Sequence, residues 1–292
     1  MEKILITGGT GLVGRKLTEL LIAKNYEVVI LSRNPQNKNE FKWDVSNNYI
    51  DENAFKNLTY IIHLAGAGIA DKRWSNDRKK VIISSRVQTT NLLLEKVKQY
   101  KIKLKGFISA SATGLYGAIT SDKIFTEKDK PSHDFLSIVC EKWENAAFEF
   151  QQENIPVTIL RTGIVLSKKG GALEKMRTPI VSPLGSGKQY IPWIHIDDLC
   201  EMYIYAIENN LEGIYNAVAP EHHTSKSFSK ELANAIKRPF ISLGVPSFLL
   251  KILFGEMAVI LLEGSRVSIK KIEKKGFSFR FSNLIIALKT FS

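Results

Sequence analysis

The first half of the chain alternates short apolar runs with stretches whose apolar residues recur at helical spacing. Residues 3–7 form an apolar run that stops at a cluster of glycines, and residues 15–22 resume with helical spacing. Strands that alternate with helices predict an α/β fold of the Rossmann type, a doubly wound, mostly parallel sheet with helices on both faces. Further strands are predicted at 26–31, 41–44, 60–65, 106–110, 156–161 and 214–218. Helices are predicted at about 76–100, with Val81, Val87, Leu92, Leu93 and Val97 on its inner side, and at 134–152.

Beyond about Gly163 the regular alternation fades, and glycines and prolines mark loops between short mixed patterns. This change predicts two parts. A dinucleotide-binding domain spans 1–165 and is joined again by about 190–220, and a smaller mixed α/β lobe on the substrate side spans 166–292.

The most apolar stretch is 245–262, which is interrupted by Lys251, Gly255 and Glu256. A membrane span needs about 20 nearly uninterrupted apolar residues, so two short buried helices are predicted instead. Core is the default for this region, and a wall of the substrate pocket or a dimer surface are the alternatives.

The composition indicates a soluble globular protein but does not indicate its function. The 292 residues are 44% hydrophobic and 24% charged, as in ordinary soluble globular proteins. The net charge of +12 comes from lysines spread along the chain among acidic residues, which favours a solvated surface over a nucleic-acid interface. The excess charge would still attract an anionic cofactor or substrate.

Cys140 and Cys200 are the only cysteines and lie far apart, which favours reduced thiols in a cytoplasmic protein. Met1 leads directly into the first strand, so no signal peptide is visible. We expect a small-molecule substrate, no nucleic-acid partner and no membrane partner, and leave monomer and homodimer open.

The glycine cluster after the first strand is the best candidate site. In residues 7–14, TGGTGLVG, Gly8 would allow the turn, Gly11 the close approach of a pyrophosphate and Gly14 the packing of helix on strand. The free N–H groups at the helix start would face the phosphates. Strand, glycine turn and helix in this order predict a dinucleotide-binding unit, with a glycine turn in another kind of α/β protein as the alternative.

The end of the second strand indicates which dinucleotide. Proteins that bind NAD carry an acid there, about 20 residues beyond the glycines, to hold the ribose 2′-hydroxyl. Here the chain reads Leu31-Ser32-Arg33, without a carboxylate. Arg33 can stack on adenine and pair with a 2′-phosphate, and Ser32 can donate to the same group. NADP(H) is therefore favoured over NAD(H), unless Arg33 simply faces solvent.

These motifs resemble a known family. The glycine segment resembles the cofactor signature of extended short-chain dehydrogenases/reductases, residues 109–117 (SASATGLYG) resemble their active-site strand, and residues 192–199 (PWIHIDDL) resemble the His-x-x-Asp segment of sugar-nucleotide epimerases. More narrowly, the whole chain resembles the atypical branch called "epimerase family protein", or family 39U. The stretches that carry this resemblance are 64–66, 73–74, 85–86, 89–90, Cys140 with 143–144, 192–195, 213–220, 262–267 and 275–279.

The resemblance implies NADP(H) contacts along one edge of the sheet. Arg86 is physically sensible, because a guanidinium can hold phosphate or ribose oxygens through two hydrogen bonds, although a solvent-facing helix arginine is the alternative. The implied cofactor-binding residues are Gly8, Thr10, Gly11, Leu12, Val13, Gly14, Ser32, Arg33, Leu64, Ala65, Gly66, Arg86 and Val165.

The usual acid/base of the resembling enzymes is missing. They use a Tyr-x-x-x-Lys pair with a nearby serine, in which the lysine lowers the tyrosine pKa, but no tyrosine here has lysine four residues later. Alignment on Glu144 places Leu136 at the tyrosine position and Cys140 at the lysine position. The candidate catalytic residues are therefore Ser111, which matches the helper serine, with Thr113 and Tyr116 just beyond it.

Other candidates have plainer interpretations. His195 can act as a general acid near neutral pH, although its segment more often positions the lobe. Cys140 can act as a nucleophile, although a buried, unreactive cysteine is commoner. His222 and His223 have no partners at metal-ligand spacing, and no metal is expected.

Three functions remain open at this point. The first is an NADP(H)-dependent oxidoreductase that moves hydride to or from a small carbonyl or alcohol. The second is a non-catalytic NADP(H)-binding sensor or scaffold, favoured by the missing tyrosine and lysine. The third is a nucleotide-sugar epimerase, which the NADP preference disfavours, since such enzymes commonly retain NAD.

Overall fold

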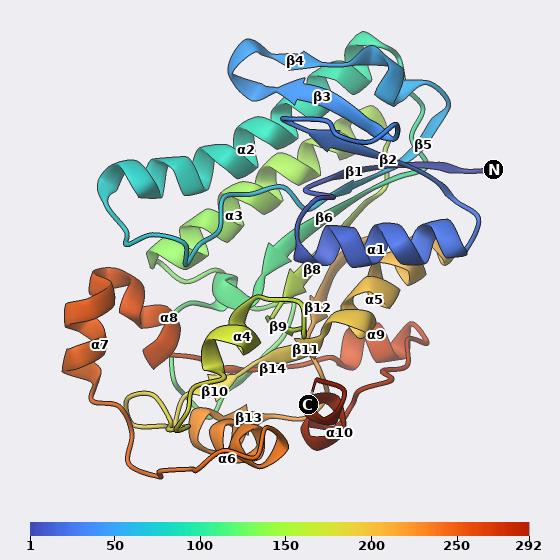
Figure 1. Ribbon diagram of the computed structural model, residues 1–292. Helices are drawn as coiled ribbons and strands as arrows, with labels where there is room; N and C mark the ends of the chain where they lie inside the picture. Colours follow the sequence, from blue (N-terminus) through green and yellow to red (C-terminus); the bar gives the residue numbers. More distant parts are fainter. Residues whose placement is uncertain (292) are drawn as a thin grey trace.

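A computed structural model, which describes residues 1–291, has one large sheet as its centre (Figure 1). Its eight strands run in the order β12-β8-β6-β5-β1-β2-β3-β4. Every neighbouring pair is parallel except β3 with β4. Parallel neighbours need a crossover connection, and helices supply most of these, so both faces of the sheet are covered. The predicted Rossmann-type α/β fold is confirmed.

The element bounds follow the sequence pattern closely. The strands of the sheet are β1 Lys3–Thr7, β2 Glu27–Ser32, β3 Glu40–Asp44, β4 Tyr49–Ile50, β5 Leu58–His63, β6 Gly106–Ala112, β8 Val157–Thr162 and β12 Gly213–Ala217. The helices beside it are α1 Leu12–Ala23, α2 Asn76–Gln99, α3 Phe135–Phe148 and α5 Ile196–Glu208. The helix predicted to end at 152 ends at Phe148 and tightens into a 3₁₀ turn over Glu149–Glu153.

Two apolar cores lie on the two faces of the sheet. One packs α1 and α5 against Ile4, Ile6 and Ile108, and the other packs α2 and α3 against Leu5 and Phe107. The prediction that Val81 faces inward is wrong. Val81 is 46% exposed and its neighbour Ile82 is completely buried. The buried stripe of α2 runs through Ile82, Thr89, Thr90, Leu92, Leu93 and Val97, and its two threonines hide the helical period from a count of apolar residues.

The second half of the chain builds a smaller lobe at the carboxyl ends of the strands. Its core includes Trp193, Phe228 and Leu284, whereas α5 and β12 return to the sheet. The division into domains at residues 165 and 190–220 stays a prediction. The remaining strands form pairs: β9 Ile164–Leu166 with β11 Trp193–His195, β10 Tyr190–Ile191 with β13 His223–Thr224, and β7 Ile124–Phe125 with β14 Arg266–Val267. The helices here are α4 Ala172–Met176, α6 Ser225–Ala235, α9 Lys270–Lys274 and α10 Leu284–Lys289.

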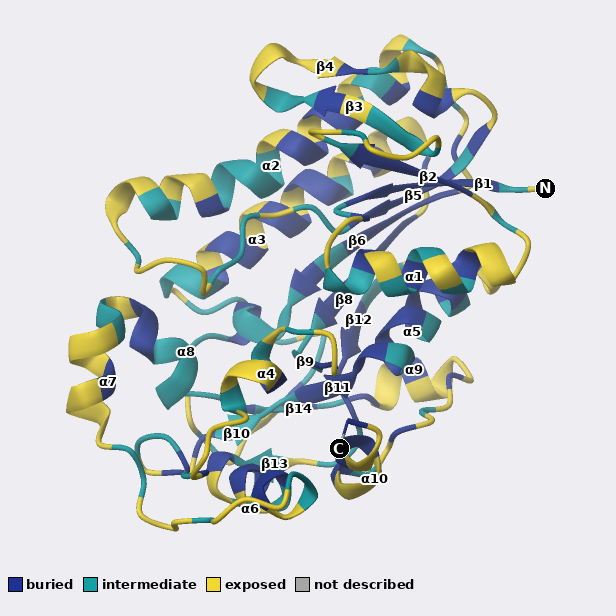
Figure 2. Cartoon of the chain, viewed as in Figure 1, coloured by how far each residue is buried: buried dark blue, intermediate teal, exposed yellow. Residues whose placement is uncertain are grey.

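The apolar stretch 245–262 does form two short helices, α7 Ser247–Phe254 and α8 Val259–Leu262, but the prediction that both are buried is wrong. Figure 2 shows α7 at the rim of the molecule with much of its surface exposed. Only Leu250 of α7 is buried, because the helix meets the lobe along one side. Among residues 1–291, no helix combines the length and apolar character that crossing a bilayer requires.

Candidate cofactor groove and active site

The glycine loop has the geometry that its spacing predicts. Gly8 has a φ of 70°, a left-handed conformation that favours glycine, and its backbone oxygen accepts from the N–H of Gly11 at 3.0 Å. A Cβ on Gly14 would lie 2.3 Å from the oxygen of Gly8 and 2.5 Å from the Cα of Gly9. The missing side chain of Gly14 therefore lets α1 approach the turn itself rather than the strand before it.

The start of α1 is open to an anion. Gly11 is the N-cap and supplies no side-chain acceptor, and the first turn contains no acidic residue. The first N–H groups of a helix lack partners within the helix and carry the positive end of its dipole. Thr10 and Gly11 are exposed, and Leu12 and Val13 are half-buried. This opening fits the pyrophosphate of a dinucleotide.

A buried histidine, His63, holds the backbone that follows β5 in place beside the glycine loop. The hydroxyl of Thr7 lies 2.7 Å from Nδ1 of His63 and accepts from the backbone N–H groups of Leu64 and Ala65, both at 3.2 Å. On the other side, Nε2 of His63 lies 3.1 Å from the hydroxyl of Thr90, which donates to a backbone carbonyl of α2. His63 therefore carries its proton on Nε2 and accepts from Thr7 at Nδ1.

Burial lowers the pKa of His63 to about 3, so the ring is neutral. The network holds the Leu64–Ala65 backbone beside Gly8, whose added Cβ would meet Leu64 at 3.0 Å. Sequence reasoning missed His63. The available signal was a histidine that ends an otherwise apolar strand.

The end of β2, where the adenine half of a dinucleotide would lie, carries a free cation. Ser32 is half-buried at the end of β2, and its hydroxyl accepts from the N–H of Asn34 at 3.3 Å. Arg33 is exposed, and its side chain makes no hydrogen bond or ion pair with any other residue of the described chain. The guanidinium is therefore available to a ligand.

Arg86 does not point to solvent as the alternative interpretation required. It lies behind Gly66, whose added Cβ would be 3.0 Å from Cζ of the guanidinium. Its Nη1 donates to the carbonyl of Ala67 at 3.1 Å, and its Cζ sits 4.9 Å from the ring centre of Trp143. Burial lowers the pKa of Arg86, and within residues 1–291 no carboxylate pairs with it. An unpaired, part-buried guanidinium at this edge suits an oxygen-rich ligand.

The segment that contains Val165 also lies near the glycine loop. Val165 lies on β9 opposite Ile194 of β11. A Cβ on Gly171 would lie 3.0 Å from Leu12 and 3.9 Å from the oxygen of Val165. The structure therefore brings Val165 close to the start of α1, as the implied site requires.

Two of the three candidate catalytic side chains belong to a buried network. The hydroxyl of Ser111, 3% exposed, donates to Oε1 of Glu144 at 2.6 Å. Arg161 donates to the same carboxylate from Nε at 2.9 Å and from Nη2 at 2.8 Å. Tyr116, 1% exposed, donates to Oδ1 of Asn216 at 2.5 Å and accepts from Arg161 at 3.1 Å. The protons of Ser111 and Tyr116 are thus committed inside the protein.

Burial raises the pKa of Tyr116 to about 12, which opposes proton transfer by its phenol near neutral pH. Thr113 differs from both neighbours. It is half-buried at the end of β6, and its hydroxyl has no hydrogen-bond partner among the described residues. Thr113 is therefore the candidate with a hydroxyl free to meet a substrate.

The positions of the missing pair lie where the alignment on Glu144 placed them. A Cβ on Gly114 would lie 3.4 Å from Cβ of Leu136 and 3.7 Å from Sγ of Cys140, so both side chains of α3 face the end of β6. Burial raises the pKa of Cys140 to about 12, which keeps it a thiol. The nucleophile interpretation of Cys140 therefore loses its physical basis.

His195 organises the lobe. Its Nδ1 accepts from the N–H of Asp197 at 3.1 Å and caps α5, while Nε2 lies 3.0 Å from the hydroxyl of Thr290. Its ring stacks on Phe281 and Phe291, with centroids 3.7 and 4.8 Å away. Burial lowers the pKa of His195 to about 4, which agrees with a positioning role. No group of three metal-ligating side chains occurs in the described chain.

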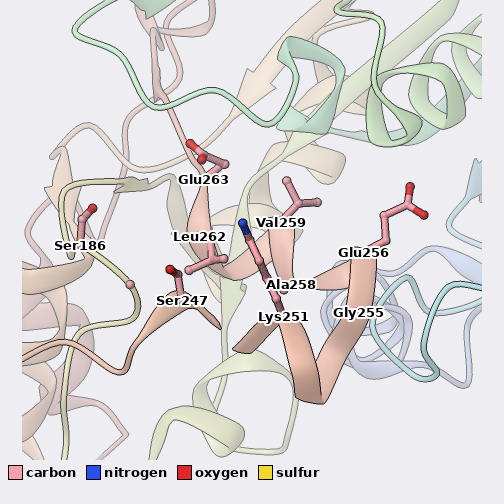
Figure 3. A pocket seen from close by; sticks show the side chains of 10 residues that line it. Ser186, Ser247, Lys251, Gly255, Glu256, Ala258, Val259, Leu262 and Glu263 are labelled. Atoms are coloured by element: carbon pink, nitrogen blue, oxygen red, sulfur yellow. The ribbon is translucent and has the colours of Figure 1, made fainter. Parts of the chain in front are cut away.

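A cavity of about 570 Å³ lies between the loop at Gly185 and the α7–α8 unit (Figure 3). Its lining includes Ser186, Ser247, Lys251 and Glu263, and Figure 3 shows Lys251 extended toward the middle of this set. The carboxylate of Glu263 accepts from Thr120 at 2.5 Å, in the segment that follows Tyr116. The cavity is therefore linked to the loop that follows the candidate active-site segment, and its volume suits a small molecule.

Comparison with known proteins agrees with this geometry. Residues 4–217 match the model of the NAD dependent epimerase/dehydratase family. The chain belongs to this family. Residues 245–291 match a second model, a domain of unknown function called DUF1731. The matches confirm the resemblance to extended short-chain dehydrogenases/reductases of the epimerase family branch, which are NAD(P)-binding proteins.

Individual relatives cover nearly the whole chain. An epimerase family protein of Staphylococcus aureus is 36% identical over 298 residues, which cover 99% of this chain and 98% of the relative. The crystal structure of the human epimerase family protein SDR39U1 with NADPH is 30% identical, covers 99% of this chain and 98% of its own, and superposes with a TM-score of 0.88. A nucleoside-diphosphate sugar epimerase from Corynebacterium glutamicum is 29% identical with a TM-score of 0.79, over 98% of this chain and 57% of its own.

Proposed function

We propose that the chain is an NADP(H)-dependent oxidoreductase that transfers hydride between its cofactor and a small carbonyl or alcohol. The observation that carries the proposal is the end of β2, where Ser32 and an unpaired Arg33 stand and a carboxylate does not. A 2′-phosphate needs a cation at this place, and a 2′-hydroxyl favours an acid. The similarity to a human relative solved with NADPH supports the same cofactor.

The residues of the groove suit the two halves of such a cofactor. The start of α1 would hold the pyrophosphate, Ser32 and Arg33 the 2′-phosphate, and Arg86 with the Leu64–Ala65 edge the nicotinamide half. When bound, the cofactor supplies or accepts the hydride. The chain then has to orient the substrate oxygen and exchange one proton with it.

Thr113 is the group that we assign to the substrate oxygen. Ser111 cannot donate to a substrate while its proton is held by Glu144 at 2.6 Å, and Tyr116 is enclosed. The Thr113 hydroxyl can donate a hydrogen bond that orients the carbonyl oxygen, and the proton that completes the alcohol after hydride transfer would come from water. The positions of the usual tyrosine and lysine hold Leu136 and Cys140, which cannot relay a proton near neutral pH.

Cofactor choice gives the first test. Replacing Arg33 by alanine is expected to weaken NADPH binding about ten- to hundredfold, since hydrogen bonds to charged groups contribute about 1.5–3 kcal/mol. NADH binding should change little, because NADH lacks the 2′-phosphate. Titrations that follow cofactor fluorescence measure both dissociation constants. Lys56→Ala removes another exposed cation and serves as the control, and tighter NADH than NADPH binding by the unchanged protein would refute the assignment.

Hydride transfer gives the second test. NADPH oxidation is followed with a panel of aldehydes, ketones and keto acids, and any activity found is expected to fall about a hundredfold in Thr113→Val, the typical effect of losing one donor to a reacting oxygen. NADPH affinity should be unchanged in that variant. Activity that survives in Thr113→Val but is lost in Ser111→Ala would transfer the role to Ser111.

A second candidate function is a non-catalytic NADP(H)-binding sensor or scaffold. The buried hydrogen bonds of the two hydroxyls favour this function, because they leave neither proton available to a substrate. Ser111 donates to Glu144, and Tyr116 donates to Asn216 and accepts from Arg161. Two results together would establish it. No compound of the panel would be reduced although NADPH binds normally, and a partner protein would be captured only in the presence of one form of the cofactor. Epimerisation of nucleotide sugars stands third, because it needs a base that removes and returns a hydroxyl proton, and unchanged sugar configuration in several nucleotide sugars would eliminate it.

A further inference from the structure

The outer face of α7 is a continuous apolar stripe without a partner in the described chain. Phe248 is 60% exposed, Leu249 42%, Ile252 67% and Leu253 64%. Phe248 and Ile252 are four residues apart, as are Leu249 and Leu253. The side chains of each pair therefore lie next to one another along one side of the helix. Figure 2 shows this side at the rim of the lobe.

The segment before α7 also exposes apolar side chains. Ile241 is 47% exposed and Leu243 80%, so six of the sixteen large exposed hydrophobic residues in 1–291 lie between 241 and 253. This segment is held in place, because the N–H of Ile241 donates to Val181 at 3.0 Å and the N–H of Val245 donates to Pro183 at 2.9 Å. A fixed apolar patch of this extent marks an interaction surface.

The charges within this segment of the chain have one sign. Residues 237–254 contain Lys237, Arg238 and Lys251 and no aspartate or glutamate. All three cations are exposed, and none forms a side-chain ion pair or hydrogen bond with another residue in 1–291. The acid that follows, Glu256, is occupied by Lys79 at 2.6 Å. The patch therefore offers apolar and basic groups together.

We propose that this surface, residues 237–254, docks onto an anionic phospholipid membrane. The α7 helix would lie flat, with its apolar stripe at the boundary of head groups and acyl chains. The exposed cations of the same segment would face anionic head groups, and Lys251, which lines the cavity beside α7, would have to turn outward to do so. The stripe lies on the exposed side of a helix at the rim of the molecule, which leaves it open to a planar partner. Attachment would be peripheral, since no helix of residues 1–291 can span a bilayer. The expectation that the chain has no membrane partner stays a prediction, and this proposal is its alternative.

A second copy of the chain is the less suitable occupant. Each copy has a net charge of +12, and large like charges keep proteins apart. A symmetric contact through this surface would also bring two sets of three cations into one interface.

The test is co-sedimentation of the full chain with extruded vesicles. We expect binding to vesicles of phosphatidylcholine with about one third phosphatidylglycerol, roughly tenfold weaker binding to phosphatidylcholine alone, and loss at high salt. Absence of binding to the anionic vesicles would overturn the proposal.

Two pairs of substitutions separate this surface from general attraction of a basic protein. Phe248→Ser with Ile252→Ser keeps every charge and is expected to lower vesicle binding at least about tenfold, because the buried apolar area is lost. Ile285→Ser with Ile286→Ser, at exposed positions of α10, is the control and should bind like the unchanged protein. Far-ultraviolet circular dichroism and urea unfolding of both variants confirm that they fold.

Equal loss in both pairs, or in neither, would overturn the docking surface. So would a dimer in light scattering that the Phe248/Ile252 pair dissolves, because a second copy would then be the occupant. These outcomes are independent of NADP(H) chemistry, so the proposed function can fail while this proposal stands.

Discussion

Replacing Gly14 by alanine is expected to destabilise the fold by about 3 kcal/mol and to abolish NADPH binding, although glycine-to-alanine changes inside helices usually stabilise by about 0.5–1 kcal/mol. The added Cβ would lie 2.3 Å from the oxygen of Gly8 and 2.5 Å from the Cα of Gly9. Both are backbone atoms of the turn, so the clash can be relieved only by moving α1 or opening the glycine loop. Either movement removes the N–H groups from the place where they meet a pyrophosphate.

Urea unfolding and NADPH titration measure the two parts of this expectation. Ile22→Ala is the control in the same helix, because Ile22 is 53% exposed and its truncation should change stability by no more than about 0.5 kcal/mol. A Gly14→Ala variant as stable as the unchanged protein would show that α1 can shift at little cost. The tight turn would then not explain the glycine.

Replacing Arg161 by methionine is expected to destabilise the fold by about 3–5 kcal/mol, because it leaves the Glu144 carboxylate buried with only Ser111 as a partner. The two side chains are 5% and 6% exposed and form two hydrogen bonds at 2.8 and 2.9 Å. The same substitution removes one of the two partners of the Tyr116 hydroxyl. Urea unfolding measures the loss.

The matched variant combines Arg161→Met with Glu144→Leu and removes both charges at similar volume. It should be more stable than Arg161→Met alone, since replacing a whole buried ion pair by apolar groups is often neutral. If the double variant is the less stable of the two, packing around Arg161 rather than the unpaired charge accounts for the loss.

Local signals predicted the sheet and the cofactor end of the site. Apolar runs and helical spacing are properties of neighbouring residues, so β1, β2 and α2 could be placed from the sequence. The glycine loop and Arg33 could be found for the same reason, since a turn and a strand end lie at fixed distances from each other along the chain.

The substrate end depends on contacts between distant residues and could not be predicted in this way. Ser111 is held by a residue 33 positions away, and Tyr116 by one 100 positions away. His63 looked like the end of an apolar strand until α2 supplied its threonine partners. The prediction that α7 is buried was wrong for another reason. The apolar residues of a helix indicate that one of its faces can be buried, but they do not indicate whether the same chain or another molecule covers that face.

The burial of both cysteines bears on how the protein would respond to oxidants. Thiolates, not thiols, react with peroxides and alkylating agents. Cys140 and Cys200 are 4% and 0% exposed, and burial raises the pKa of both. The thiol groups of both cysteines are therefore shielded from oxidative modification. During oxidative stress, both thiols would therefore stay reduced for as long as the protein remains folded.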